Sequence, residues 1–187
     1  MTTFLTLSGK LPLVIAHRGA SGVLPEHTLP AYTRAIEMGA DFIEPDLVIT
    51  KDGHLVARHD RYLSGSTDVS DKPEFANRKR TDPNHKGEDW FIEDFTLAEI
   101  KTLRARQPRA GRSKEFDGQY AVPTFDEILE LLTEARKTTG RDIGIYPETK
   151  QPTAFAKVGL RHDEAMLKSL ESAGSVSYTH LTLPTKA

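Results

Sequence analysis

The 187-residue chain contains no cysteine, which excludes disulfide bridges and metal sites built from thiolates. It has no apolar run near the roughly 20 residues that a membrane-crossing helix needs, so we expect no membrane span. The formal net charge is only −2, so no overall field would recruit nucleic acid. The first ten residues lack the basic and apolar regions of a secretory signal peptide. This indicates a cytoplasmic protein, or a chain whose start omits a leader.

The pattern of apolar and turn residues predicts an α/β domain. Residues 11–16 form an apolar run typical of a buried strand, and Thr28 can cap a helix that ends near residue 38. A second strand is expected over 41–50. The turn that follows is too short for a parallel crossover, so residues 54–59 are expected to return as a hairpin, the alternative being a short second strand whose end overhangs.

A long polar segment, residues 60–120, interrupts this alternation and indicates an inserted subdomain. Two sequences of the capping-box type open helices at about 96–104 and 124–136. A further strand is expected at 142–149 and a further helix at 163–173. The order of these elements favours an α/β fold.

Acidic side chains alternate along the second strand. Because successive side chains of a strand point to opposite faces, Glu44 and Asp46 share one face and converge. A pair of buried carboxylates is costly without a cation, and a hard divalent ion bound by oxygen atoms resolves that cost. The alternative is two solvated carboxylates on an exposed strand.

The later strand repeats this arrangement. Glu148 and Lys150 share a face, so Glu148 can supply a third oxygen ligand and Lys150 can neutralise phosphate charge. The alternative is an ordinary surface pair of Glu and Lys.

Two histidines stand at the ends of extended runs, where the active sites of barrel enzymes collect. His17 ends the first run and His59 ends the third. A neutral and a protonated imidazole can act as base and acid in one displacement, whereas a lone histidine at a strand end is more often structural. Arg18 adds a guanidinium that can bind phosphate oxygens as a fork. Together these residues indicate a metal-assisted attack on a phosphodiester.

Three motifs carry a family resemblance. They are His-Arg-Gly-Ala-Ser-Gly at 17–22, Glu-His-Thr at 26–28, and Glu-Pro-Asp-Leu-Val-Ile-Thr-Lys-Asp-Gly-His-Leu-Val-Ala-Arg-His-Asp at 44–60. With these motifs the chain resembles the glycerophosphodiester phosphodiesterases over residues 11–174, and it is most similar to their calcium-using, often exported branch. Residues 60–120 look like the insertion of that family.

The resemblance implies a partial (β/α)8 TIM barrel of the phosphodiesterase type, with the insertion after the third strand. It implies hydrolysis of a small-molecule glycerophosphodiester to glycerol 3-phosphate and an alcohol, through attack by the substrate's own glycerol hydroxyl and a cyclic phosphate. The implied cofactor is a divalent metal, calcium first and magnesium as the alternative. The implied residues are the metal ligands Glu44, Asp46 and Glu148, the acid and base His17 and His59, and the phosphate-binding Arg18 and Lys150. Glu26 belongs to the family's first motif without an assigned role.

The length of the chain and its last residues indicate how much of a domain it contains. A full barrel takes about 250 residues, so residues 1–174 are expected to be the N-terminal part of a C-terminally truncated domain. Residues 175–187 resemble adapter read-through and are expected not to be native, the alternative being a weak edge strand. The resemblance implies a periplasmic location, and the oligomeric state stays open. Alternative functions are a related lysophospholipid or sphingomyelin phosphodiesterase, or a fragment that binds metal or phosphate without catalysis.

Overall fold

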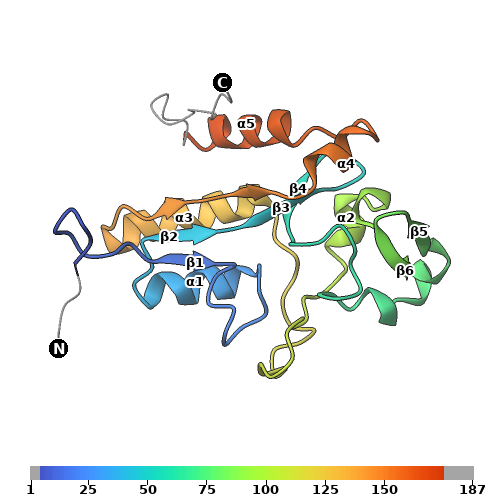
Figure 1. The fold of residues 1–187 in the computed structure, drawn as a ribbon, viewed down its shortest axis with the longest axis horizontal. Helices are drawn as coiled ribbons and strands as arrows, with labels where there is room; N and C mark the ends of the chain where they lie inside the picture. The colour runs from blue at the N-terminus through green and yellow to red at the C-terminus, as the bar shows by residue number, and fades with distance from the viewer. Residues whose placement is uncertain (1–4, 175–187) are drawn as a thin grey trace.

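The computed structural model describes residues 5–174 and is built on a parallel sheet with helices packed on one of its faces (Figure 1). The sheet order is β1, β2, β7, and all three strands are parallel. The strands are β1 (Ile15–His17), β2 (Phe42–Glu44) and β7 (Gly144–Ile145). Two helices cover this sheet, α1 (Leu29–Glu37) and α3 (Phe125–Thr139).

The second and later strands continue past a short interruption. Pro45, which has no N–H to donate, separates β2 from β3 (Asp46–Ile49). Beside it, β8 (Glu148–Thr149) follows β7 and pairs in parallel with β3. The N–H of Tyr146 donates to the carbonyl of Ile43, so the ladder runs on between the two pairs. The two halves therefore form one continuous wall of strands.

Sequence signals at the helix ends explain where the helices lie. Thr28 caps α1 and accepts a hydrogen bond from the N–H of Ala31. Thr124 and Glu127 form the expected capping box of α3, which ends at Gly140 in the left-handed conformation. The apolar faces of both helices pack on the sheet in one buried cluster: Tyr32, Ile36, Ile43, Ala57, Ile128, Leu132 and Ile143.

The predicted hairpin is confirmed. β4 (Leu55–Ala57) pairs antiparallel with β3, in register from Leu47 opposite Ala57 to Ile49 opposite Leu55. Residues 54–59 are thus a return strand on the rim and not a strand of the parallel wall. Every residue of β3 and β4 is buried, because the inserted segment and α3 cover this hairpin.

The expectation of a buried strand over residues 11–16 is wrong. Regular pairing begins only at Ile15, and Leu13 and Ile15 remain 68% and 49% exposed. β1 pairs with β2 along one edge, and no strand within residues 5–174 pairs with its other edge. An apolar run favours a buried position, but it becomes buried only where a neighbouring strand packs beside it.

Residues 60–120 fold into a lobe beside the wall, drawn in green in Figure 1. Its elements are η1 (Val69–Asp71), η2 (Pro73–Arg78), β5 (Arg80–Asp82), β6 (His85–Asp89), η3 (Ile92–Asp94) and α2 (Leu97–Ile100). Phe75, Trp90 and Phe95 of the lobe share one buried cluster with Leu47 of β3 and Leu129 of α3. The lobe thus has an apolar core that its polar sequence did not reveal.

Two helices follow the wall, α4 (Pro152–Ala156) and α5 (His162–Ser172). The first was not expected from sequence, and the second matches the helix expected at 163–173. No helix within residues 5–174 is long and apolar enough to cross a membrane. The expected foreign tail, residues 175–187, lies outside the described residues.

Gly144 provides a test of how the wall packs. A Cβ at this position would lie 2.2 Å from the ring of Phe42, which covers the glycine from the neighbouring strand. We expect Gly144→Ala to lower the free energy of unfolding by about 1–3 kcal/mol, the usual cost of overpacking. Urea denaturation measures the change.

Gly65→Ala is the matched control, since a Cβ there meets nothing within 4 Å. If the clash with Phe42 is the cause, Phe42→Ala in the same chain removes most of the additional cost of Gly144→Ala. If the losses of stability in Gly144→Ala and Phe42→Ala simply add in the double variant, the clash with Phe42 is not the cause.

Candidate active site

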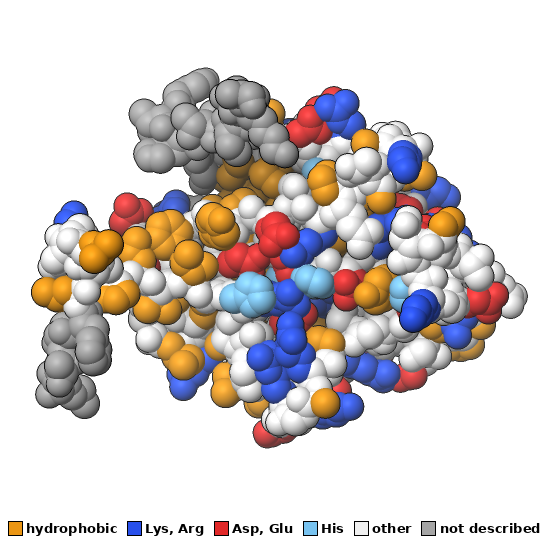
Figure 2. Space-filling view, in the orientation of Figure 1, with side chains coloured by type: hydrophobic (Ala, Val, Ile, Leu, Met, Phe, Trp, Pro, Cys, Tyr) orange, Lys and Arg blue, Asp and Glu red, His pale blue; other side chains and the backbone are white. Residues whose placement is uncertain are grey.

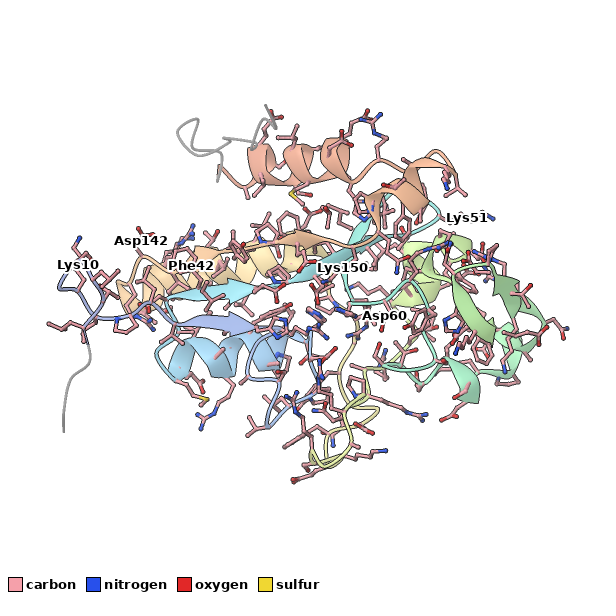
Figure 3. All side chains as sticks on the ribbon, viewed as in Figure 1. Lys10, Phe42, Lys51, Asp60, Asp142 and Lys150 are labelled. Carbon is pink, nitrogen blue, oxygen red and sulfur yellow. The ribbon has the colours of Figure 1, made fainter. Side chains whose placement is uncertain are left out.

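The acidic and basic residues singled out from sequence meet at the carboxyl ends of the parallel strands. Register places His17 beside Glu44 on neighbouring strands, and Asp46 beside Glu148. Carboxylate oxygens of Glu44, Asp46 and Glu148 all lie within 4.8 Å of one another. Figure 3 places Lys150 at the same end of the wall. This is the end at which barrel enzymes carry their active sites.

Asp46 is the centre of this arrangement and is fully buried. Its Oδ1 lies 2.9 Å from Nζ of Lys150, and its Oδ2 lies 3.1 Å from Nε of Arg18 and 3.0 Å from Nε2 of His27. Burial alone would raise the pKa of Asp46, but the contacts from His27 and Lys150 and the charge of Arg18 hold that pKa well below its usual range. Asp46 is therefore ionised at neutral pH.

His27 is a part of the site that the sequence did not reveal. Its Nδ1 lies 2.8 Å from the hydroxyl of Tyr32 on α1. Burial lowers the pKa of His27 to about 4, and burial with the charge of Glu44 raises the pKa of Tyr32, so both are neutral at pH 7. The imidazole then donates from Nε2 to Asp46 and accepts at Nδ1 from the Tyr32 hydroxyl. His27 thus orients the buried carboxylate.

Arg18 is held by carboxylates on two sides. Its NH1 donates to Oε1 of Glu26 at 2.9 Å, and its backbone N–H donates to Oε2 of Glu44 at 3.0 Å. Below it, the buried Arg58 donates from NH1 to the carbonyl of Glu26 at 3.1 Å. The structure therefore gives Glu26, which had no assigned role, the task of positioning Arg18.

The backbone at the site is strained. Arg18, His27 and Gln151 have φ values of 65°, 57° and 48°, and they are the non-glycine residues within 5–174 with positive φ. Each is a site residue or adjoins one, which matches the tendency of strain to collect at functional sites. Gly19 also has positive φ, and a Cβ there would lie 2.7 Å from the backbone of Ala31. The turn after His17 thus needs glycine to pack against α1.

The two histidines occupy different settings. His17 is exposed at the end of β1, and burial together with the charge of Arg18 lowers its pKa. His59 follows β4, and its Nδ1 lies 2.9 Å from Oδ1 of Asp60. The backbone N–H of the preceding residue, Arg58, donates to the carbonyl of Asp46, which brings His59 close to the carboxylate cluster.

The surface at this end of the wall combines all three kinds of side chain. Figure 2 shows histidine side chains on both sides of Lys or Arg side chains, with acidic side chains directly above. The structure thus gathers the seven residues chosen from sequence at one end of the wall. The residues that sequence reasoning left without a role are Glu26, His27, Tyr32 and Arg58, which lie beneath that surface.

The acidic cluster suits a divalent cation. Its three members offer carboxylate oxygens, the donors that hard ions such as calcium and magnesium prefer. Burial and the nearby charge of Asp46 raise the pKa of Glu44 to about 7, an effect that its contact with Arg18 offsets only in part. A cation at this position would supply that partner.

Comparison with known proteins identifies the family. The family model described as the glycerophosphoryl diester phosphodiesterase family matches residues 17–182. The chain belongs to this family. The match includes all the residues of the site and runs eight residues into the segment 175–187.

Curated relatives support this assignment. The chain is 48% identical over 145 residues to a glycerophosphodiester phosphodiesterase of Arabidopsis thaliana, an alignment that covers 75% of this chain and 37% of the relative. It is 37% identical over 173 residues to the glycerophosphodiester phosphodiesterase of Haemophilus influenzae, covering 87% of this chain and 46% of the relative. The chain thus spans less than half the length of these relatives.

Solved structures support the fold. A phosphodiesterase of Oleispira antarctica, solved with the product sn-glycerol 3-phosphate, superposes with a TM-score of 0.63 at 28% identity and covers 87% of this chain. The chain covers 53% of that structure. A structure from Silicibacter pomeroyi gives a TM-score of 0.64. The fold is therefore a partial barrel of the TIM type, as the sequence predicted.

The raised pKa of Glu44 predicts how metal binding depends on pH. Protonated Glu44 must lose its proton to bind a cation, so calcium affinity rises as pH increases from about 6 to about 8. Titration calorimetry in buffers of different ionisation enthalpy should show nearly one proton released per ion at the lower pH and far less at the higher.

Without metal, the stability of the protein changes with pH in the direction opposite to that of calcium affinity. A raised carboxyl pKa means that the folded protein binds the proton more tightly, so the contribution of Glu44 to stability is lost as pH rises through about 7.

Glu44→Gln is the control for the calorimetric measurement of proton release, since it removes the titrating proton. Proton release that persists in this variant would contradict the assignment.

Proposed function

We propose that the protein hydrolyses glycerophosphodiesters to sn-glycerol 3-phosphate and an alcohol, with calcium held by Glu44, Asp46 and Glu148. The observation that carries the proposal is that these three carboxylates lie together beside Arg18 and Lys150 at the strand ends of a family member. A relative of the same fold was solved with sn-glycerol 3-phosphate, which supports this product.

The cations would bind the substrate's phosphate. Arg18 and Lys150 flank Asp46 from opposite sides, and their positive charges face the carboxylate cluster. The guanidinium of Arg18 is fixed by Glu26, so little conformational entropy is lost when it binds an anion. A bound divalent cation compensates phosphate charge and lowers the pKa of a nearby hydroxyl.

Calcium is the ion we favour. It accepts carboxylate ligands in irregular geometries, whereas magnesium demands a near-ideal octahedron and keeps several waters. The three carboxylates come from neighbouring strands at distances set by the sheet register and not by an octahedron. Activity with magnesium alone would favour the other ion.

The histidines would move the protons. The lowered pKa of His17 keeps its imidazole neutral at pH 7, so we assign it the base that takes the proton of the attacking glycerol hydroxyl. His59, beside Asp60, would give a proton to the alcohol as the bond from phosphorus to the alcohol oxygen breaks. Water then opens the cyclic phosphate with the two roles reversed.

The proposal is tested by release of sn-glycerol 3-phosphate from glycerophosphocholine. We expect release that requires calcium and stops on chelation. His17→Ala should lower kcat/KM by about 10²–10⁴, the usual contribution of acid or base catalysis. The matched control is His54→Ala, since His54 is an exposed histidine at the turn of the rim hairpin, directly before β4.

Two outcomes decide the matter. No release by the unmodified protein in the presence of calcium would sink the proposed activity. Equal losses of kcat/KM in His17→Ala and His54→Ala would contradict a role of His17 in proton transfer.

A further inference from the structure

Tyr32 of α1 is a buried side chain to which the proposed chemistry gives no task. It is fully buried and belongs to the same apolar cluster between helices and sheet as Ile36 and Ile128. Its backbone N–H donates to the carbonyl of Thr28 at 3.1 Å, in the first turn of the helix. Packing and the helix therefore fix the position of the Tyr32 hydroxyl.

That hydroxyl meets the imidazole of His27. The Tyr32 oxygen lies 2.8 Å from Nδ1, and on the other side of the ring Nε2 lies 3.0 Å from Oδ2 of Asp46. All three side chains are fully buried, so bulk solvent does not compete for these hydrogen bonds. Two successive hydrogen bonds thus connect helix α1 to Asp46.

The chemistry of the three groups sets the direction of both hydrogen bonds. An ionised carboxylate only accepts, so Nε2 of His27 carries the proton that it donates to Asp46. The imidazole is neutral, so Nδ1 keeps its lone pair and the Tyr32 hydroxyl is its donor. Loss of that hydroxyl would leave Nδ1 as a buried acceptor without its donor, which costs free energy. The ring then gains by turning toward another donor, and a turned ring no longer donates to Asp46.

The hydrogen bond from His27 decides which oxygen of Asp46 is left for a cation. Oδ2 lies 3.0 Å from Nε2 of His27 and 3.1 Å from Nε of Arg18. Oδ1 is paired with Nζ of Lys150 at 2.9 Å, but it accepts no hydrogen bond of regular geometry within residues 5–174. A carboxylate held at one oxygen presents the other in a fixed direction, as a metal ligand requires. Oδ1 is therefore the oxygen of Asp46 that suits a divalent cation.

The backbone at His27 is strained in a way that serves this contact. Its φ is 57°, in a region that non-glycine residues seldom adopt. Its N–H donates to the carbonyl of Arg18 at 3.2 Å, and the next residue, Thr28, is the N-cap of α1. His27 is thus fixed between the turn after β1 and the start of α1. Such strain persists where the surroundings hold it, and it collects at functional sites.

We propose that Tyr32 is a positioning residue of the metal site, which acts through His27 to hold Asp46 with Oδ1 directed toward the divalent cation. This inference rests on the proposed function, because it concerns the same carboxylate cluster. It makes helix α1 a part of that site. The effect of Tyr32 falls on calcium affinity, and on catalysis only through that affinity.

Tyr32→Phe tests the proposal, because it removes the hydroxyl and keeps the ring. Calcium titration calorimetry on the 187-residue chain at pH 8, where Glu44 is mostly ionised, should show about tenfold weaker binding. The matched control is Ile128→Val, which trims the same buried cluster from α3 and leaves the hydrogen bonds of His27 intact. We expect the control to bind calcium as the unmodified protein does.

Nitrogen-15 NMR of the histidine rings, recorded without calcium, gives a readout that a general loss of stability would not change. We expect His27 to have a protonated Nε2 and an unprotonated Nδ1 that accepts a hydrogen bond. In Tyr32→Phe the Nδ1 signal should move toward the position of a ring nitrogen without a hydrogen bond. In Ile128→Val it should stay in place. His27→Gln removes the ring and so assigns the signals.

Three results would overturn the inference. If Tyr32→Phe binds calcium as tightly as the unmodified protein, or if Ile128→Val weakens binding equally, Tyr32 does not position a ligand. If the Nδ1 signal of His27 is the same with and without the Tyr32 hydroxyl, that hydroxyl does not act on the imidazole. Both of these results leave the proposed function standing. If the unmodified protein binds no calcium, the proposed metal site fails together with the inference.

Discussion

The burial of Asp46 is the constraint on which the rest of this structure depends. A carboxylate without solvent is tolerated only when positive charge and hydrogen-bond donors replace the water. Here the replacements come from three separate segments, since Arg18 follows β1, His27 precedes α1 and Lys150 follows β8. Each of these segments is fixed in turn by the need to reach Asp46. The positive φ values at Arg18 and His27 are part of the energetic cost of burying Asp46 in this way.

The need to balance buried charge also applies to the groups around Asp46. Glu26, Glu44 and Glu148 face the cations Arg18, Arg58 and Lys150, so the carboxyl groups including Asp46 outnumber the cations by one. Burial and the nearby charge of Asp46 raise the pKa of Glu44. A divalent cation and the anion of a phosphodiester would together restore neutrality.

The inserted lobe is joined to the site in two ways. Its apolar core is continuous with that of β3 and β4, so it holds the hairpin that carries Arg58 under the site. Its residues 106–114 contact the turn after His17 through Gln107 and Arg112. The lobe therefore contacts the segments on both sides of the cluster.

The sequence by itself determined the local features. Strand parity placed Glu44 with Asp46, the short turn at 51–53 required a hairpin, and capping residues marked where α1 and α3 begin. These features depend on neighbours within a few residues, which a sequence displays directly. Only the tertiary structure decided the exposure of Leu13, the core of the inserted lobe and the contact of His27 with Asp46. Each of those depends on which distant segment packs against a residue, and no local spacing encodes that choice.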